Sequence, residues 1–518
     1  MRSNRYIIAM IAMIVALGGL LMGFDASVIS GVVRFIEPEF GLTKLELGWS
    51  VASLTLTATL AMMISGPLSD RFGRRSVLRV AAILYAVSAI CSALAPTFLT
   101  LVIARMIGGF GVGASLILAP MYIAEMSPPD IRGRMVSFNQ LNIVIGISLA
   151  FFTNYLILQW GKSDAAWAVW LKLDEYNWRW MLGLETLPAI LYFIGLFFVP
   201  KSPRWLILKG KVDEAKSIMA NLTSEEEAEA AMAEIKKSEK AREGDPKASI
   251  KDLLKPSLRL VLTIGVVVAV LQQITGINSV FFYAPMIFEQ SGIGTDASFV
   301  QAILVGLANL VFTILAILFI DKLGRKPLLS FGVAGITLCM FLLAYGFHSA
   351  TYEVSQATFE GIAEVSSSNV EEVMGKRFDT EADFMQAMSS VLSEEQLLAE
   401  KAGMITASIR MNATLILFAI LGFVASFAIS IGPVMWVLFS ELFPNKIRGI
   451  AISFVGLINS GISFVVQWVF PWELEYLGSA TTFLIYGLFA AAGLVFIIRV
   501  IPETKGKSLE EIEAQLVR

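Results

Sequence analysis

Two six-residue stretches, Asp70-Arg-Phe-Gly-Arg-Arg75 and Asp321-Lys-Leu-Gly-Arg-Lys326, decide the fold of this chain. Both follow the order acidic, basic, apolar, glycine, basic, basic. Each links the second and third apolar runs of one half of the sequence, and these runs are close to the roughly 20 residues that a helix needs to cross a membrane. The same charged loop at the same place in both halves indicates an internal repeat, so the other motifs are interpreted in pairs.

A glutamate and an arginine seven residues apart form the second matched pair of motifs. Glu125 precedes Arg132 in the first half, and Glu441 precedes Arg448 in the second half. Each pair lies at the end of an apolar run and at the start of the next one. The repeat therefore extends to the fourth and fifth apolar runs of each half.

The third matched pair consists of Pro200-Lys-Ser-Pro and Pro502-Glu-Thr-Lys, and each motif follows the sixth apolar run of its half. The separation between the charged loop and the glutamate is 55 residues in the first half and 120 in the second. An insertion at 349–408 accounts for nearly all of this excess. Three matched pairs in one order are hard to attribute to chance.

The apolar runs number twelve, six in each half, and predict an all-α membrane protein with twelve transmembrane helices in two pseudo-symmetric six-helix bundles. This is the plan of the major facilitator fold. The expected helices are 7–33, 47–68, 76–94, 98–121, 135–158, 180–200, 257–286, 297–320, 327–347, 409–440, 447–470 and 478–500. The expected domains are an N-terminal bundle (1–200), a cytoplasmic linker with surface helices (201–256), a C-terminal bundle (257–500) with a soluble, partly helical outer insertion (349–408), and a cytoplasmic tail (501–518).

The composition agrees with a membrane protein and argues against several other classes. Of the 518 residues 56% are hydrophobic and only 16% are charged, against about a quarter charged in soluble proteins. A net charge of −3 without a basic block argues against a nucleic-acid partner. The single histidine, His348, and the two cysteines, Cys91 and Cys339, make no metal site or catalytic set. We expect no metal, no cofactor and no enzymatic activity.

The charges of the short loops predict the orientation, because positively charged loops stay in the cytoplasm. The two repeated loops are basic. The loops expected on the other side are acidic and contain Glu37, Glu39, Glu473 and Glu475. Both termini and the linker are therefore predicted to be cytoplasmic, and the insertion is predicted to lie outside. The chain is expected to be a multi-pass protein of the cell (plasma or inner) membrane, embedded in a lipid bilayer.

The charged residues of the repeated motifs are candidates for a cytoplasmic gate. Positive charges alone would hold loops inside, but this topological role does not explain an acidic partner at a fixed spacing in both halves. Ion pairs between helix ends would close the cytoplasmic side and break on each cycle, which suits exposed pairs of about 1 kcal/mol or less. The candidate residues are Asp70, Arg74, Glu125, Arg132, Asp321, Arg325, Glu441 and Arg448.

Three ionisable residues stand out within predicted spans: Asp25, Arg105 and Glu185. A charge at the centre of a membrane costs at least about 2.5–3.5 kcal/mol, so such residues are functional candidates by default. A carboxylate beside a water-filled cavity can take up a proton once a neighbouring arginine moves away. Asp25 and Arg105 are therefore the candidate proton-coupling pair, and the alternative is a permanent salt bridge that only joins helices. For Glu185 we favour a structural hydrogen-bonding role.

Polar residues in the seventh predicted helix provide the candidate substrate site. Gln272, Gln273 and Asn278 share one helical face. Neutral amides donate and accept hydrogen bonds, which matches the paired hydroxyls of a sugar. One isolated amide would more often join two helices, at about 0.6 kcal/mol, but three on one face favour a site. The further candidates on other helices are Gln140, Asn309, Gly432, Trp436 and Asn459.

In these motifs the chain resembles the sugar porter family of the major facilitator superfamily over nearly its full length. The matching stretches are Gly66-Pro-Leu-Ser-Asp-Arg-Phe-Gly-Arg-Arg75, Arg105-Met-Ile-Gly-Gly, Pro200-Lys-Ser-Pro-Arg-Trp205, Gln272-Gln-Ile-Thr-Gly-Ile-Asn278 and Pro502-Glu-Thr-Lys-Gly506. The chain is most similar to bacterial xylose/hexose–proton symporters, which have an acidic residue at the position of Asp25. The resemblance implies that Asp25 accepts a proton beside Arg105, that the polar candidates contact sugar, and that the charged motif residues form a cytoplasmic network.

Several positions depart from the xylose symporters. Phe282 stands in place of a sugar-contacting tyrosine, and Met22 in place of an aromatic residue. Asn459 and Ser460 stand in place of a glutamine and a tryptophan. The pocket is therefore expected to be roomier or differently polar, so the sugar need not be xylose.

The sequence thus predicts a secondary active transporter that carries a monosaccharide (a hexose, a pentose or a polyol) together with a proton by alternating access. The alternative is a facilitative sugar or polyol uniporter, for example for inositol, in which Asp25 is structural. A sugar sensor with a transporter-like body is a candidate from another class. Such sensors usually signal through long cytoplasmic tails, whereas the tail expected here is short.

Overall fold

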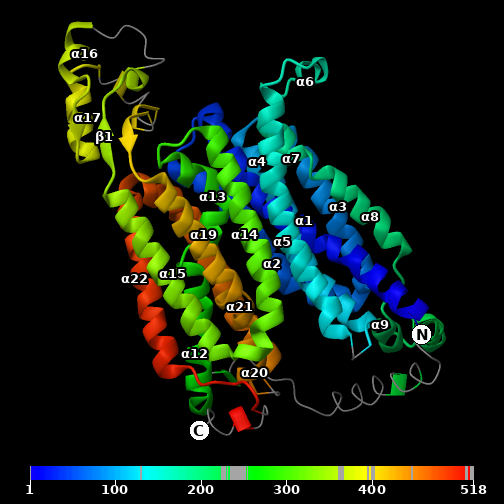
Figure 1. The fold of residues 1–518 in the computed structure, drawn as a ribbon. Helices are drawn as coiled ribbons and strands as arrows, with labels where there is room; N and C mark the ends of the chain where they lie inside the picture. The colour runs from blue at the N-terminus through cyan, green and yellow to red at the C-terminus, as the bar shows by residue number, and fades with distance from the viewer. Residues whose placement is uncertain are drawn as a thin grey trace.

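The computed structural model describes residues 2–128, 131–222, 229, 232–233, 252–253, 255–359, 367–393, 396–397, 403–405, 407–444, 447–507 and 511–513. At 2–4, 320–321, 367–369 and 381–382 it describes the backbone alone. Twelve helices or broken helices among these residues are long and apolar enough to cross a membrane. The prediction of an all-α membrane protein with twelve spans is confirmed, and Figure 1 shows the spans packed side by side as a tilted bundle.

The first half has six spans, the last of them broken. Its helices are α1 (Arg2–Phe40), α2 (Lys44–Phe72), α3 (Arg74–Ala93), α4 (Phe98–Met126), α5 (Arg132–Gly161), the short α6 (Ala166–Trp170), and the pair α7 (Asn177–Gly183) and α8 (Thr186–Phe198). Residues next to the helix ends determine where these helices begin and end. At the start of α2 the Thr43 side chain accepts from the N–H of Glu46, whose carboxylate accepts from the N–H of Thr43. This reciprocal cap satisfies donors that a helix start leaves unpaired.

Glycines let the helices of this half approach one another closely. A β-carbon added at Gly23 of α1 would lie 2.0 Å from the carbonyl oxygen of Ile143 in α5. One added at Gly113 of α4 would lie 2.1 Å from the carbonyl oxygen of Ala58 in α2. Small residues allow such contacts between transmembrane helices, which have no hydrophobic drive to associate within lipid. Any larger side chain at these two positions would push the helices apart.

The second half repeats the six spans, with two of them broken. Its helices are α12 (Arg259–Ile274), α13 (Ile277–Glu289), α14 (Thr295–Leu323), α15 (Arg325–His348), α19 (Ala413–Ile429), α20 (Ile431–Leu442), α21 (Arg448–Tyr476) and α22 (Ser479–Val500). The pairs α12–α13 and α19–α20 each form one broken span.

The breaks correct three spans that the sequence analysis expected to be continuous. Gly276 separates α12 from α13 in a left-handed conformation (φ +85°), and an added β-carbon there would meet the ring of Tyr486 at 2.4 Å. Ser430 separates α19 from α20 (φ −124°, ψ −103°), and residues 184–185 separate α7 from α8. Non-helical backbone at membrane depth is tolerated only where it is buried in protein or lines a cavity. The breaks therefore indicate that the backbone at these positions is buried within the protein or lines a cavity.

The linker and the tail lie beside the ends of the helices. The linker begins with two helices, α9 (Pro203–Leu208) and α10 (Val212–Leu222), and leads into the second half through the turn η2 (Pro256–Leu258). That linker helices lie on the membrane surface stays a prediction. Much of the remaining linker, and residues 508–510 and 514–518 of the tail, lie outside the described residues.

The insertion after α15 is a small unit with its own core. Its elements are β1 (Thr351–Glu353), η3 (Gln356–Phe359), α16 (Ser367–Val373), β2 (Arg377–Phe378), α17 (Glu381–Ser389) and β3 (Ile409–Arg410). The strands form an antiparallel sheet in the order β2-β1-β3. Tyr352 stacks on the buried ring of Phe384, with ring centroids 5.5 Å apart. The sequence analysis expected helices here but no sheet, because strands of two or three residues are too short for a recognisable alternation.

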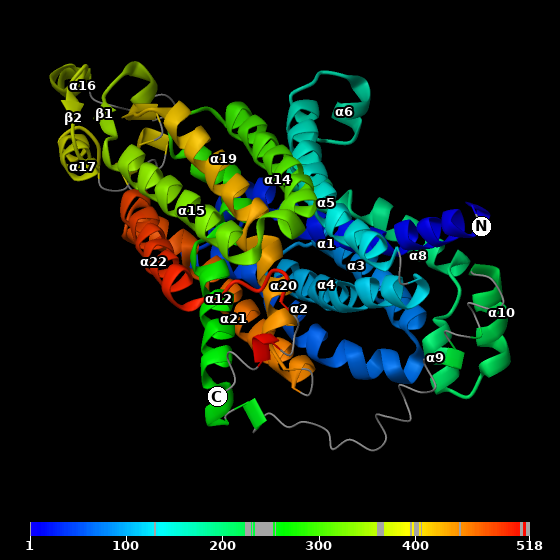
Figure 2. The same cartoon turned by 60° about the horizontal axis from the view of Figure 1, so that its bottom comes forward.

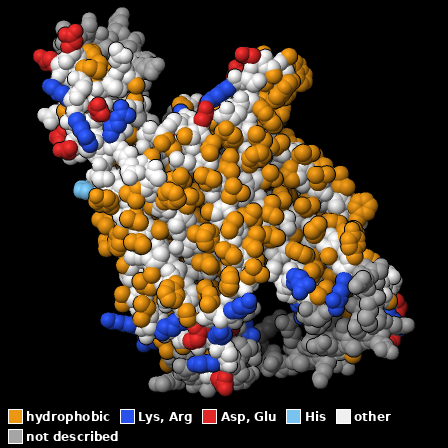
Figure 3. All heavy atoms as spheres, in the orientation of Figure 1, with side chains coloured by type: hydrophobic (Ala, Val, Ile, Leu, Met, Phe, Trp, Pro, Cys, Tyr) orange, Lys and Arg blue, Asp and Glu red, His pale blue; other side chains and the backbone are white. Residues whose placement is uncertain are grey.

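The two ends of the bundle differ in charge and in what they carry. We name the end with the Arg74–Arg75 and Arg325–Lys326 loops the basic face, and the end with the insertion the insertion face. Figure 1 places both chain ends toward the basic face and the insertion at the opposite end. Figure 2 turns the basic face forward and shows α9 and α10 beside the first half. Figure 3 shows hydrophobic side chains over the flanks, with Lys and Arg gathered at the ends.

The two halves contact each other from the middle of the bundle to the insertion face. α2 packs on α21, where a β-carbon added at Gly48 would lie 1.9 Å from the carbonyl oxygen of Trp468. α5 packs on α14, where the Ser148 hydroxyl donates to the carbonyl of Gly306 at 2.9 Å. At the basic face, Figure 3 shows the surface hollowed between the halves. The structure is therefore closed at the insertion face.

Candidate functional site

Asp25 and Arg105 meet inside the first half, and both side chains are 2% exposed. Arg105 Nη1 lies 3.4 Å from Asp25 Oδ1, while its Nε donates to the carbonyl of Ser50 at 2.9 Å. Asp25 Oδ2 has no hydrogen-bond partner among the described residues. A β-carbon added at Gly108 would lie 3.0 Å from Oδ2, so this glycine provides the space around that oxygen. A tight, permanent ion pair would be shorter, about 2.7–2.9 Å. This carboxylate can gain a proton without losing a strong hydrogen bond.

Glu185 lies at the break between α7 and α8 and is also 2% exposed. Its Oε1 has no hydrogen-bond partner among the described residues. It is close enough to Asp25 and Arg105 to interact electrostatically with both. The sequence analysis favoured a structural hydrogen-bonding role for Glu185. At Oε1 the described residues provide no such hydrogen bond. By position, Glu185 belongs to the ionisable group around Asp25.

Four amide side chains form a second buried group, which we name the amide cluster: Gln272, Gln273, Asn278 and Asn459. The break at Gly276 lets residues on both of its sides face α21, which carries Asn459. Gln273 Nε2 donates to Gln272 Oε1 at 3.2 Å and to Asn459 Oδ1 at 3.1 Å. Asn459 Nδ2 donates to Gln272 Oε1 at 2.8 Å, and Asn278 Nδ2 to Gln273 Oε1 at 2.9 Å.

Every N–H of the amide cluster is used inside the protein. The acceptors outside the cluster are the carbonyl oxygens of Ala269, Ile431 and Gly432, the hydroxyl oxygen of Ser463 and the sulfur of Met435. Asn278 Oδ1 is the one cluster oxygen that accepts no hydrogen bond from a described residue. A hydroxyl-bearing ligand must therefore exchange with bonds already made, each with a net value of about 0.5–1.5 kcal/mol. Discrimination between ligands then depends on how the amides are oriented.

The remaining candidates lie on several helices. Gly432 joins the cluster through its carbonyl oxygen, which accepts from Gln272 at 3.3 Å. Trp436 of α20 is 48% exposed, with its ring edge-on to Phe439. Gln140 of α5 is exposed and Asn309 of α14 is buried. The structure thus joins Asn459 and Gly432 to the glutamines, and it leaves Gln140, Asn309 and Trp436 without a hydrogen bond to the cluster in the described part of the chain.

Three polar residues beside the cluster, Ser463, Gln467 and Thr55, were missed by the sequence analysis. Asn459, Ser463 and Gln467 are spaced four residues apart on α21 and so share a face. Gln467 Nε2 donates to Ser463 Oγ at 2.7 Å, and Thr55 Oγ1 of α2 donates to Gln467 Oε1 at 2.8 Å. The repeated spacing of four within an apolar helix was the available signal. No pattern in the sequence indicated Thr55.

The motifs of the first half form a charge cluster at the basic face. Arg74 Nη1 lies 2.8 Å from Asp70 Oδ1, and its Nη2 lies 3.2 Å from Glu125 Oε1. Ser202, two residues after Pro200, donates its hydroxyl to Glu125 Oε2 at 2.5 Å. The proline-led motif therefore binds the same glutamate as the charged loop, and Ser202 is a member that the sequence analysis did not identify.

The second half has the equivalent cluster. Arg325 Nη2 lies 2.8 Å from Glu441 Oε1, and Thr504 donates its hydroxyl to Glu441 Oε2 at 2.6 Å. Thr504 stands two residues after a proline, as Ser202 does, so the repeat extends to individual hydrogen bonds. The side chain of Asp321 lies outside the described residues.

The two remaining gate candidates start the helices that follow each cluster. Arg132 is exposed at the start of α5. Arg448, at the start of α21, donates its Nε to the carbonyl oxygen of Phe443 at 3.1 Å. Each ion pair of the two charge clusters joins residues of the same half. The sequence analysis expected one cytoplasmic network, and in this conformation the charged residues form two separate clusters.

Glu503 completes the second cluster, although the sequence analysis did not select it. Its carboxylate accepts from the backbone N–H of Arg325 at 3.1 Å and of Lys326 at 3.2 Å, the first residues of α15. Partial burial alone would raise the pKa of Glu503, but hydrogen bonds from backbone N–H groups outweigh burial and hold this pKa below its ordinary value. An anion at a helix N-terminus contributes about 0.3–1 kcal/mol.

Glu503→Gln should destabilise the detergent-solubilised protein at pH 7 by about 0.3–1 kcal/mol. A carboxylate with a depressed folded-state pKa stabilises the protein above its unfolded pKa of about 4.3 and stops doing so as pH falls through the folded value. The difference in thermal unfolding temperature between wild type and variant should therefore shrink as pH falls below about 4. Glu513→Gln alters an exposed tail carboxylate as the control. A difference independent of pH, or an equal effect in the control, would contradict this role.

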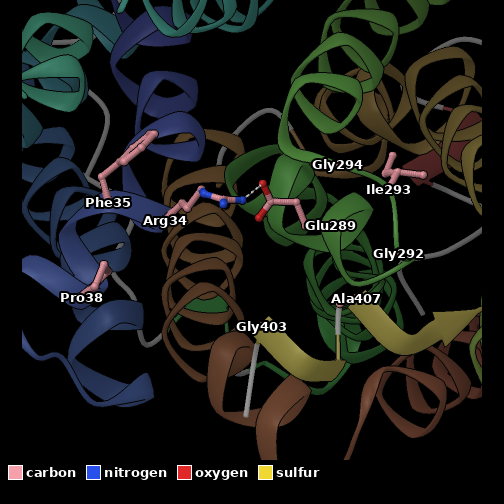
Figure 4. Close-up of a pocket in the computed structure, with 9 residues that line it drawn as sticks. All are labelled: Arg34, Phe35, Pro38, Glu289, Gly292, Ile293, Gly294, Gly403 and Ala407. Atoms are coloured by element: carbon pink, nitrogen blue, oxygen red, sulfur yellow. Dashed lines mark hydrogen bonds and ion pairs between the residues drawn. The ribbon is translucent and has the colours of Figure 1, made fainter. Parts of the chain in front are cut away.

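A cavity of about 670 Å³ lies on the insertion face where the two halves and the insertion meet. Its lining residues are Arg34, Phe35, Pro38, Glu289, Gly292, Ile293, Gly294, Gly403 and Ala407. Arg34 of α1 forms an ion pair with Glu289 of α13, which joins the two halves across this cavity (Figure 4). Gly292 (φ +81°) packs against the insertion, since an added β-carbon would lie 2.7 Å from Ile409 Cγ2.

Comparison with known proteins gives concordant results in sequence and structure. The model of the "Sugar (and other) transporter" family matches residues 11–365 and 384–516. The chain is 35% identical over 506 residues to the arabinose-proton symporter of Bacillus subtilis (strain 168), covering 98% of this chain and 94% of that protein. It is 35% identical over 549 residues to the D-xylose-proton symporter of Escherichia coli (strain K12), covering 99% and 96%. The fold matches the inward-open conformation of the xylose transporter XylE from E. coli with a TM-score of 0.75 at 33% identity, covering 98% and 100%.

Proposed function

Because this chain belongs to the sugar transporter family and has the major facilitator fold, we propose that it carries a monosaccharide together with a proton across the cell membrane by alternating access. Its relatives are transporters and not enzymes, and two of them are named proton symporters of pentoses. The observation that carries the coupling is Asp25, a buried carboxylate with one oxygen unpaired among the described residues and one long contact to Arg105.

In this proposal the basic face is cytoplasmic and the insertion face lies outside. The basic loops of both halves support this orientation through the positive-inside rule. Both termini are then cytoplasmic, and a structure closed at the insertion face represents the inward-facing state. When the cytoplasmic side closes, the charge clusters around Glu125 and Glu441 approach each other, and their ion pairs exchange partners between the halves.

The proposed sugar site is built on the amide cluster. Sugar hydroxyls would replace some of the bonds that the four amides now make to one another, with Trp436 as the aromatic face on which a sugar ring can stack. Gln140 and Asn309 would contribute from α5 and α14, and the carbonyl oxygen of Gly432 would hold Gln272. The sugar would thus contact both halves, which is how its binding can favour one arrangement of the halves over another.

The test is transport by the purified protein in liposomes that enclose a pH-sensitive dye. Arabinose, xylose, glucose, galactose and inositol are added outside, one at a time, and uptake of labelled sugar is followed in parallel. We expect at least one sugar to enter and to acidify the lumen. Entry without acidification would overturn proton coupling and support a uniporter. Entry of none of them would overturn the proposed function for these sugars.

A further inference from the structure

Gln467 stands between the amide cluster and the opposite half of the protein. It is 1% exposed. Its Nε2 donates to Ser463 Oγ at 2.7 Å, and its Oε1 accepts from Thr55 Oγ1 at 2.8 Å. Thr55 lies on α2 in the first half, whereas Gln467 lies on α21 in the second. One carboxamide is therefore held by both halves at once.

Ser463 extends this restraint to the amide cluster. Its hydroxyl oxygen also accepts from Asn278 Nδ2 at 2.7 Å, and the same nitrogen donates to Gln273 Oε1 at 2.9 Å. Both N–H groups of Asn278 are thereby committed, which fixes the direction of its Oδ1. A chain of side-chain hydrogen bonds thus runs from Thr55 through Gln467 and Ser463 to Asn278 and Gln273.

The bond between Thr55 and Gln467 depends on the contact between α2 and α21. The same contact brings the backbone at Gly48 against that of Trp468, whose indole N–H donates to the carbonyl of Leu45 at 3.1 Å. Separation of α2 from α21 at the insertion face removes this contact. A hydrogen bond needs its heavy atoms within about 2.5–3.2 Å, so it cannot survive that separation. Among the described residues, the carboxamide of Gln467 is then held by Ser463 alone.

We propose that Gln467 is a positioning residue for sugar binding, which links closure of the insertion face to the orientation of the amide cluster. This inference rests on the proposed function and assigns Gln467 no contact with sugar. Two effects follow from it. Loss of the bond to Thr55 shifts the halves toward an open insertion face. It also changes which arrangement of sugar hydroxyls the amides favour.

The first effect is measured without sugar, as a distance between spin labels on the two halves. The labels are placed at Trp170→Cys of α6 and Tyr476→Cys of α21, which are 81% and 69% exposed at the insertion face. The native Cys91 and Cys339 are replaced by serine. The distribution of distances in lipid nanodiscs reports how often the insertion face is open.

Thr55→Val and Gln467→Met should raise the ratio of long to short distances about fivefold, the factor expected for one ordinary hydrogen bond. Thr55→Ser keeps the hydroxyl and should keep the wild-type distribution. If neither Thr55→Val nor Gln467→Met changes the distances, the link between the halves through Gln467 is overturned. A shift in Thr55→Ser as large as that in Thr55→Val would also overturn it, since the hydroxyl would then be irrelevant.

The second effect is the ratio of KM values for two sugars that differ at one hydroxyl, such as glucose and galactose. A change in the populations of the conformations with open and closed insertion face multiplies the apparent affinity for every sugar by the same factor, so it leaves the ratio of KM values unchanged. Glu289→Gln breaks the ion pair with Arg34 far from the amide cluster, so it is the matched control: it should leave the ratio unchanged. Gln467→Met and Thr55→Val should change the ratio by about fivefold through misoriented amides.

An unchanged ratio in Gln467→Met overturns the positioning role, and so does an equal change in Glu289→Gln. If the wild-type protein carries no sugar, the proposed function and the positioning role both fall. The distance distributions then still decide whether Gln467 links the two halves. Failure of the proposed function and failure of the cross-half link are therefore separate results.

Discussion

Asp25→Asn should abolish uphill accumulation of sugar while leaving exchange of sugar across the membrane measurable. Asparagine has the size of aspartate but cannot take up a proton near neutral pH, so the proton gradient no longer drives transport. The asparagine side chain still fills the space that Gly108 leaves beside Asp25 Oδ2. The amide cluster, the proposed sugar site, lies on the other half of the protein, so its hydrogen bonds should persist. Proteoliposomes with an imposed pH gradient give accumulation, and preloaded proteoliposomes without a gradient give exchange.

The variant leaves Arg105 without its carboxylate, and removing one partner of a buried ion pair can cost about 3–5 kcal/mol. Retained exchange is therefore the internal check that the variant is folded. Asp296→Asn is the matched control, because Asp296 is half-exposed at the insertion face and, among the described residues, forms its ion pair with Lys162. The control should accumulate sugar as the wild type does. Accumulation by Asp25→Asn at the wild-type level would show that Asp25 is structural and that another group carries the proton.

Gln272→Met should lower kcat/KM for sugar uptake by more than about tenfold. Gln272 Oε1 accepts from both Gln273 and Asn459. Methionine has a similar length but no comparable acceptor, so two buried N–H groups lose their partner, at about 1–3 kcal/mol each. The amide cluster then rearranges and no longer presents its donors in the same directions. Initial rates of labelled sugar uptake at varied concentration measure this loss.

The control for this variant is Gln290→Met, which removes a partly buried amide at the insertion-face end of α13. Gln290 accepts from the hydroxyl of Ser479 and lies outside the amide cluster. Its variant should keep uptake close to the wild-type rate. Equal losses in both variants would mean that uptake responds to general destabilisation of α12 and α13, and a wild-type rate in Gln272→Met would exclude the amide cluster as the sugar site.

The sequence was sufficient for the number of spans and for the repeat, because apolar runs and charged loops are local patterns. It was also sufficient to select Asp25 and Arg105, since a charge inside an apolar run is conspicuous wherever its partner lies. It did not reveal the break at Gly276. A glycine in an apolar run is compatible with a continuous helix, and the left-handed conformation of Gly276 depends on its packing against Tyr486.

Contacts between segments far apart in the chain were the features that the sequence most often failed to predict. Thr55 and Gln467 are 412 residues apart, and a threonine in a spanning helix ordinarily bonds a carbonyl of its own helix. Ser202 and Thr504 were present in the matched motifs, but a hydroxyl in a loop gives no sign of its acceptor. The short strands of the insertion were invisible for a different reason: they are held by pairing across 26 and 59 residues, not by their own sequence.

The packing of Gly292 against Ile409 connects the insertion to the turn that follows α13. Gly292 belongs to the turn after α13, and α13 carries Asn278 at its other end. In the proposed orientation the insertion face lies outside the cell, so an antibody fragment raised against the insertion would reach its epitope without crossing the membrane. By holding this turn in one position, the fragment would inhibit transport without contacting the proposed sugar site. Such an inhibitor would be non-competitive and specific to carriers that possess this insertion.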